Sequence, residues 1–412
     1  MVDADHVRLG RIAEKLAEAR AKPVVPMPFG VEVHGFVVGP PLSEAVVAEF
    51  EEWHEVSLPP AYRLFVTELG GGGAGPGYGL CRLEPSCCAY LRSGHLAQPS
   101  PYLPGPRYPV DWEQRHENPP GPGQNFLRGT LAVAAHGCSL TTQLIVTGPA
   151  RGRLFNLDGG SLGGAAPYVV EDVDFLAWYE RWLDEAVAGY DVSWFGERLP
   201  MPESELVAVL LSDASPDRRS RAGVSLLDLP AIRDSSWTAL VGAMTADADA
   251  DVRASMWLLL NRARNKHGRR FDDAEEIADD IERYARSCTP PDLRALGALK
   301  RLTFADMLAE LASPDLERRR RAATAAHEFW RFAETSAPRG LLGDAIAGLL
   351  RDPDPLVRSC GVAMVRWFDP ASVPLLRQLQ TTETDPWVRF RIRECLDERS
   401  TAAACDDAAE PA

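Results

Sequence analysis

Apolar residues near the start of the chain recur mostly at helical spacing. Within residues 3–20, Leu9, Ile12 and Leu16 share one narrow face, which predicts a helix that buries little surface. Residues 31–38 (VEVHGFVV) alternate between apolar and polar positions and predict a short strand. Ser43 then stands where a helix N-cap is expected. The apolar face predicted for this helix consists of Leu42, Val46, Val47, Phe50 and Trp53.

A further helix is predicted directly after Leu58 and Pro59. Pro60 suits its first turn, because the N–H that proline lacks would be unpaired there anyway. The apolar residues of this helix follow an i, i+3, i+4, i+7 pattern up to the glycine-rich run at 70–79, which can continue neither a helix nor a regular strand. The residues of this face are Tyr62, Phe65, Val66 and Leu69.

The pattern changes to short strands after a long Pro/Gly-rich segment at 99–125. Residues 131–135, 141–148 and 152–158 predict three antiparallel strands joined by short turns. A closing helix is predicted from about Asp172, with Phe175, Tyr179 and Trp182 on its apolar face. These elements together predict an α+β domain, an antiparallel sheet with flanking helices.

From residue 200 onward the strand pattern disappears and a repeat takes its place. Short apolar helices each lead into an acidic or Pro-containing turn, after which a second helix begins with an arginine near its start. Because one helical hairpin cannot bury both of its faces, neighbouring hairpins must stack, which predicts an all-α solenoid. The arginines that define the repeat are Arg219, Arg253, Arg319, Arg358 and Arg389.

These patterns divide the 412 residues into four parts. We expect an N-terminal helix with a Pro-rich lead-in at 1–29 and the α+β domain at 30–192. The solenoid is expected at 200–398, and a disordered tail at 399–412.

Charge and composition narrow the functional classes. Lys and Arg number 44 against 59 Asp and Glu, a net charge of −15, which disfavours broad contact with nucleic acid or anionic membrane. The eight cysteines lack CxxC spacing, which fits reduced thiols better than disulfides or a zinc site. With no signal-peptide pattern and no long apolar run, we expect a cytoplasmic protein that does not enter a membrane.

The first half resembles the SMI1/KNR4 (SUKH) family, chiefly through FEEWHEVSLPPAYRLFVTELGGGGAGPGYGL (50–80) and FLAWYERWLDEA (175–186). The resemblance implies an α+β fold with a central antiparallel sheet. For many bacterial members it implies an immunity protein that binds and neutralises a toxin. The second half is similar to HEAT-like repeats, through Asp251-Val252-Arg253 and the segment 354–358. The residues that match the SUKH motif are Leu58, Pro59, Tyr62, Phe65, Gly71, Gly72 and Trp182.

Three motifs suggest chemistry, and each has a plainer interpretation. Residues 70–75 satisfy GxGxxG, but they follow a helix and lead into Pro76, which favours a tight connection over a phosphate site. Residues 159–163 satisfy GxSxG without the helix that a nucleophile elbow needs. His136 and Cys138 lie close together in a turn, where side chains diverge. We therefore expect no enzymatic activity, no cofactor and no metal.

Two sets of charged residues remain as candidates for binding. The repeat arginines could grip phosphates, but nearby aspartates favour a role in ordering the stack. Acidic residues of the first half could steer a basic partner such as a nuclease-type toxin. We therefore predict a bacterial immunity protein; the alternative is a scaffold or regulatory adaptor that recruits partners through the solenoid. The candidate partner-binding residues are Glu49, Glu52, Glu171, Asp172 and Asp174.

Overall fold

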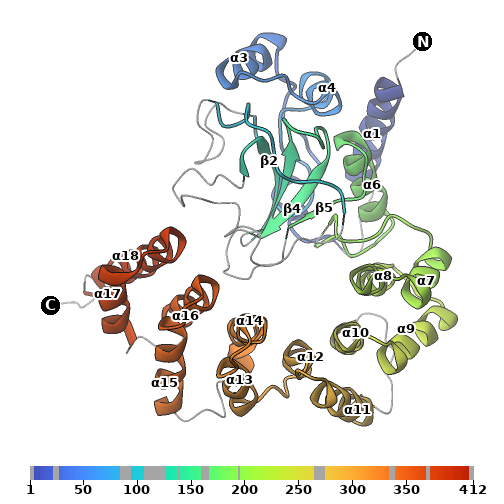
Figure 1. Ribbon diagram of the computed structural model, residues 1–412. Helices are drawn as coiled ribbons and strands as arrows, with labels where there is room; N and C mark the ends of the chain where they lie inside the picture. Colours follow the sequence, from blue (N-terminus) through green and yellow to red (C-terminus); the bar gives the residue numbers. More distant parts are fainter. Residues whose placement is uncertain are drawn as a thin grey trace. The chain divides into compact units, whose positions relative to one another are not determined.

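The computed structural model describes most of the chain (Figure 1). The described residues are 4–21, 27–83, 94–105, 127–137, 140–158, 167–193, 195–263, 274–333, 339–367 and 372–407. They form two compact units. The first holds the described residues up to 243 together with 259–263, and the second holds 244–258 and the described residues from 274 onward.

The first unit is built around one antiparallel sheet with the strand order β1-β2-β3-β4-β5. The predicted meander is confirmed, because β2 pairs with β3 and β3 with β4, both antiparallel. The strands are β1 (Gly79–Leu80), β2 (Thr130–Gly137), β3 (Leu140–Ile145), β4 (Leu154–Asp158) and β5 (Tyr168–Val169). The helices are α1 (Ala4–Ala21), α2 (Val31–His34), α3 (Glu44–His54), α4 (Pro60–Glu68), α6 (Phe175–Val187), α7 (Glu203–Ser212), α8 (Pro216–Asp228) and α9 (Asp234–Ala246), whose last residues belong to the second unit.

The core of this unit lies where α6 meets the sheet and α4. The Phe65 ring packs edge to face on Phe175, with centroids 5.1 Å apart, and lies tilted against the Tyr179 ring. Helix α1 joins the same core through its apolar stripe. It is also bound to α6 by Arg11 and Lys15, which donate to the Glu180 carboxylate at 2.8–3.0 Å. The N-terminal helix is therefore part of this core rather than a separate lead-in.

The strand predicted at 31–38 is wrong. Residues Val31–His34 form the short helix α2, and only Val38 makes an isolated bridge, to Gly73. The reason lies in the two glycines that flank the helix: Gly30 and Gly35 have φ values of 83° and 53°. This left-handed conformation is open to glycine and breaks the extended path that a strand requires.

The segment between α6 and α7 is packed rather than free, although no periodicity marks it in the sequence. Val192, Phe195 and Leu199 are buried. The Leu199 N–H donates to Ser225 Oγ of α8 at 2.8 Å. The first helical pair, α7 and α8, therefore belongs to the same compact unit as the sheet.

The second unit contains helices only in the residues that the structure describes. Helix α10 begins in it, and the following helices pack in pairs, α13 on α14 and α15 on α16. The last helix continues through residues 399–407, which we expected to be disordered; 408–412 lie outside the described residues. The helices are α10 (Ala250–Ala263), α11 (Ala274–Ser287), α12 (Leu293–Ala298), α13 (Phe304–Leu311), α14 (Leu316–Ala333), α15 (Arg339–Leu350), α16 (Pro355–Trp367), α17 (Val373–Thr382) and α18 (Pro386–Asp407).

Candidate functional site

The five repeat turns share one hydrogen-bonding register. Counting the repeat arginine as position seven, the side chain at position one accepts from the backbone N–H of position three in every turn. The side chain at position three in turn accepts an N–H of the first turn of the next helix. These bonds satisfy helix N–H groups that would otherwise have no partner. The residues at positions one and three are Asp213 and Ser215, Asp247 and Asp249, Ser313 and Asp315, Asp352 and Asp354, and Glu383 and Asp385.

The repeat arginine completes four of these turns. The guanidinium groups of Arg219, Arg253, Arg319 and Arg358 each donate through Nη1 to the carbonyl oxygen of position one. The fifth, Arg389, is exposed. These arginines close the loop between two helices, so at least one donor of each is used within the protein rather than for an external phosphate.

Two of the arginines also join neighbouring repeats. Arg319 Nε donates to the carboxylate of Asp352 at 2.8 Å, and Arg358 donates to both oxygens of Glu383 at 2.7 and 2.8 Å. The Glu383 bond raises the pKa of Arg358. In these repeats the arginine therefore orders the stack, as the nearby acidic residues indicate.

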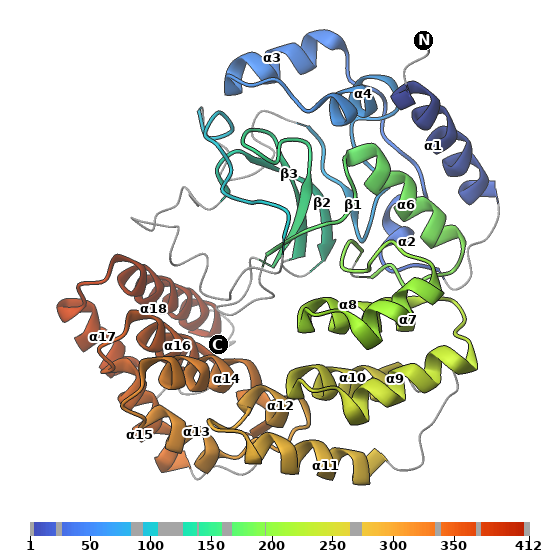
Figure 2. The same ribbon diagram turned by 45° about the vertical axis from the view of Figure 1, so that its right-hand side comes forward.

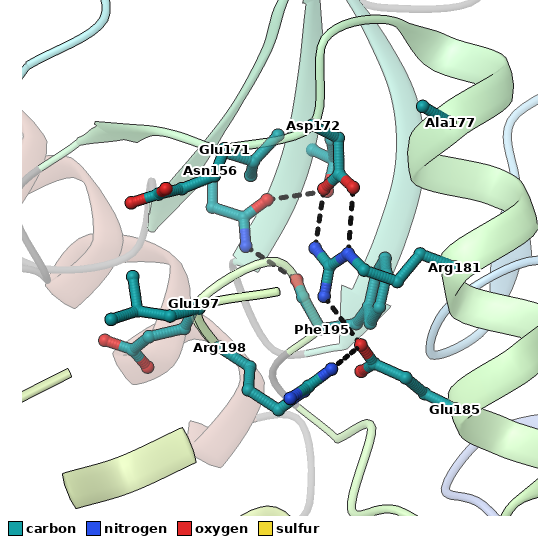
Figure 3. Close-up of polar contacts among 12 residues, drawn as sticks. Asn156, Glu171, Asp172, Ala177, Arg181, Glu185, Phe195, Glu197 and Arg198 are labelled. Carbon is teal, nitrogen blue, oxygen red and sulfur yellow. Dashed lines mark hydrogen bonds and ion pairs between the residues drawn. The ribbon is translucent and has the colours of Figure 1, made fainter. Parts of the chain in front are cut away.

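The acidic cluster before α6 is engaged within the protein. Arg181 donates to the two oxygens of Asp172 at 2.8 and 2.6 Å (Figure 3). Asp174 caps α6 by accepting the Ala177 N–H at 2.8 Å. Glu171 accepts from Arg218 of α8 at 3.0 Å. These three carboxylates hold α6 and α8 in place, so they do not form a free acidic surface.

Arg181 is the centre of a buried ionic network that spans α6 and the following segment. Its guanidinium also donates to Glu185 at 3.0 Å and lies 4.4 Å above the Phe195 ring. Glu185 in turn pairs with Arg198. Burial by itself lowers the pKa of Arg181, but the hydrogen bonds and charges of Asp172 and Glu185 outweigh it and raise that pKa. This network fixes the chain between the sheet and the first helical pair.

Helix α3 lies at the edge of the first unit, beside α4 (Figure 2), and its acidic residues differ in their contacts from those before α6. Its buried face is one stripe, formed by Val47, Phe50 and His54. Glu49 and Glu52 are exposed, and no other described residue makes a hydrogen bond or ion pair with their carboxylates. Of the predicted acidic residues, these two remain available to a partner.

The sequence pattern predicted that Val46 and Trp53 lie on the buried face of α3, and this prediction is wrong. Val46 and Trp53 belong to its apolar set, but their side chains are 44% and 59% exposed. Because α3 lies at the edge, its neighbours cover only a narrow stripe. The signal that could have found this is the spacing: 47, 50 and 54 already form a complete i, i+3, i+7 face, which leaves 46 and 53 on the next one.

The residues on which the predicted SUKH resemblance rests lie in the core. Leu58, Tyr62, Phe65 and Trp182 are all buried, as is Pro59. They position α4 and α6 rather than forming a binding surface.

The glycine-rich run forms a tight connection against the rest of the first unit. A Cβ on Gly71 would lie 2.8 Å from the Leu42 side chain. Gly72 and Gly73 adopt φ values of 144° and 99°, and a Cβ on Gly73 would lie 2.6 Å from the Val37 carbonyl oxygen. The Tyr179 hydroxyl donates to the Ala74 carbonyl at 2.8 Å, which ties this turn to α6.

The structure describes the other candidate motifs only in part. His136 is buried and bonded to the Thr142 hydroxyl at 2.7 Å, and burial lowers its pKa to about 4. Thr142 continues this chain by donating to Asn156 at 2.7 Å. Cys138 and the GxSxG run lie outside the described residues. The described part of the chain contains no group of three His, Cys, Asp or Glu placed to hold a metal ion, and none of its helices is long and apolar enough to span a bilayer.

Comparison with known proteins adds no relative. No protein-family model matches the chain, and neither a curated protein nor a solved structure matches it. The fold that the structure shows, a small antiparallel sheet with helices followed by a helical region, is compatible with the predicted α+β and all-α halves. Resemblance to the SUKH and HEAT-like families remains an expectation from the sequence.

Proposed function

We propose that this chain is a non-catalytic protein-binding protein that neutralises a basic toxin by forming a stoichiometric complex with it. The observation that carries the proposal is the exposed acidic face of α3, where Glu49 and Glu52 lack an internal partner among the described residues. Residues 42–57 contain no Lys or Arg, so nothing within this segment neutralises that face.

Neighbouring carboxylates make the contrast clear. Glu44 and Glu51 of the same helix accept hydrogen bonds from Arg63, and the bond from Arg63 lowers the pKa of Glu44. Glu49 and Glu52 therefore supply negative charge that no described residue neutralises through a hydrogen bond or ion pair. Such charge attracts a basic partner over a Debye length of about 8 Å at physiological ionic strength and raises its association rate.

The helical repeats support a second candidate, an adaptor that recruits partners. Four of the five turns are held by the same three kinds of hydrogen bond and the fifth by two of them, so the helix pairs enter a complex already ordered. A preordered surface loses little conformational entropy on binding. In this case the partner would bind the second unit instead of α3.

Co-expression tests the proposal directly. The probes are basic nuclease-type toxins expressed one at a time, and the readout is cell survival with the full chain, with residues 1–243 and with residues 244–412. The N-terminal fragment must extend to 243, because a cut after Tyr190 would remove Phe195 and the α8 arginines that bind Glu171. Rescue by the full chain and by 1–243 supports the proposal. Rescue by 244–412 alone would assign toxin binding to the second unit instead of α3. No rescue together with no complex in gel filtration refutes toxin neutralisation and favours the adaptor.

A further inference from the structure

Helix α3 carries an exposed tryptophan beside Glu49 and Glu52, whose carboxylates have no partner among the described residues. Val46, Glu49 and Trp53 follow one another at i, i+3 and i+7, so they share one face of the helix, and Glu52 adjoins it. Trp53 is 59% exposed although it is among the largest apolar side chains. The fold thus leaves an apolar stripe with acidic residues along it, facing away from the core.

The backbone that carries this stripe is ordered by internal contacts. Ser43 caps the helix by accepting the Val46 N–H. On another face, Arg63 bonds to both Glu44 and Glu51. The Phe50 and His54 rings pack 4.5 Å apart in the buried stripe. An anchor on an ordered helix requires little rearrangement on binding, which favours affinity.

Tryptophan is also the residue most enriched at the energetic centres of protein interfaces. Its indole buries a large apolar area and its face attracts Lys and Arg cations. Surface acidic residues add the long-range attraction that steers such a partner. An apolar anchor and acidic residues on one helical face are therefore complementary to a partner surface that is apolar at its centre and basic around it.

We propose that the α3 face formed by Val46, Glu49, Glu52 and Trp53 is the contact surface for the partner. It fits a protein with an apolar pocket that receives the indole and a rim of Lys and Arg that meets the carboxylates. This inference rests on the proposed function, since it names the contact residues and the partner chemistry of that binding. Within it, Trp53 sets the lifetime of the complex, and Glu49 and Glu52 set the rate of its formation.

The test measures association and dissociation rates of the full chain with a purified basic nuclease-type toxin, the one from which co-expression of the full chain gives rescue. Trp53→Ala should raise Kd by about 30-fold or more, mainly through faster dissociation. The pair Glu49→Lys and Glu52→Lys should slow association about tenfold at low salt, and added salt should reduce that difference.

Matched controls separate this face from general effects of charge and apolar surface. Glu14→Lys together with Glu32→Lys makes the same charge change at two exposed positions on α1 and α2. Leu211→Ala removes a comparably exposed apolar side chain, 58% exposed, from α7. Both controls should bind as the wild type does. Circular dichroism of every variant verifies that the helices remain intact.

The outcomes distinguish the inference from the function on which it rests. If the wild type binds and the Trp53 and Glu49/Glu52 variants bind equally well, the α3 surface is wrong while protein binding stands. If the charge-reversal control slows association as much as the α3 pair, the local steering is wrong. If the wild type itself does not bind the probe, both the function and this surface are overturned.

Discussion

Replacing Arg181 by methionine tests the buried ionic network at its centre. The substitution keeps a long, flexible side chain beside Phe195 but removes three hydrogen bonds, two to Asp172 and one to Glu185. Glu185 keeps Arg198 as a partner. Asp172 keeps no other ion-pair partner among the described residues, and only 6% of its side chain is exposed. An uncompensated buried carboxylate is the main consequence.

The expected cost follows from these contacts. Removing one partner of a buried ion pair costs about 3–5 kcal/mol, and losing the cation–π contact with Phe195 adds about 1 kcal/mol. The double variant Arg181→Met with Asp172→Leu should recover most of this loss, because no buried charge is then left without a partner. Arg181→Lys should fall between wild type and Arg181→Met, since an ammonium group cannot make the two parallel bonds to Asp172.

Native-state hydrogen exchange measures this locally, which matters because a chain with two units need not unfold in one step. Amides of α6 should exchange at least about 100-fold faster in Arg181→Met, as a loss of about 3 kcal/mol implies. Amides of α14 and α16 in the second unit serve as the internal reference and should not change. A change in α6 below tenfold, or no recovery in the double variant, would refute the argument that Arg181 compensates a buried charge.

Three further predictions address the turns, the glycine-rich connection and the buried histidine. Arg358→Met should destabilise the second unit by about 3–5 kcal/mol, because it leaves the Glu383 carboxylate, whose side chain is only 2% exposed, without this partner. The exposed control Arg389→Met should change the stability by no more than about 0.5 kcal/mol. Equal melting temperatures of the two variants would contradict this prediction. Gly79→Ala should lower the free energy of unfolding in urea by roughly 2–4 kcal/mol, since Gly79 has a φ of 103° and a Cβ there would lie 2.2 Å from the Gly73 carbonyl oxygen. Gly10→Ala, at a position on α1 with open space around it, should cost nothing. Similar stabilities of the two variants would show that the turn can relax. The pKa of His136 is about 4 in the folded protein and ordinarily 6.5, so between these pH values the unfolded chain binds a proton that the folded chain does not. The free energy of unfolding therefore falls as the pH falls through this range, by on the order of 3 kcal/mol. His136→Gln should flatten this part of a stability–pH curve, and an unchanged slope would contradict the assignment.

Elements whose cause is local could be predicted from the sequence. Pro60 at the start of α4, Ser43 before α3 and the short strand-forming runs of β2 to β4 act through neighbouring residues only, and the structure shows these elements. The repeat turns also lie within seven consecutive residues, so their acidic residues and arginines are visible as a pattern. The pattern did not separate α2 from a strand, because the left-handed conformations of Gly30 and Gly35 leave no mark on the alternation of side chains.

The availability of each charged or apolar side chain was decided by tertiary structure alone. Glu171 and Glu49 look alike in the sequence, but Arg218, distant in the chain, reaches Glu171, while Glu49 stays unpaired among the described residues. The sequence predicts that Trp53 is buried because it is apolar, yet the covered face of α3 is too narrow to include it. Periodicity tells which residues can be buried together. How much of a helix its neighbours cover, and which distant cation meets which carboxylate, depends on the packing of elements far apart in the chain.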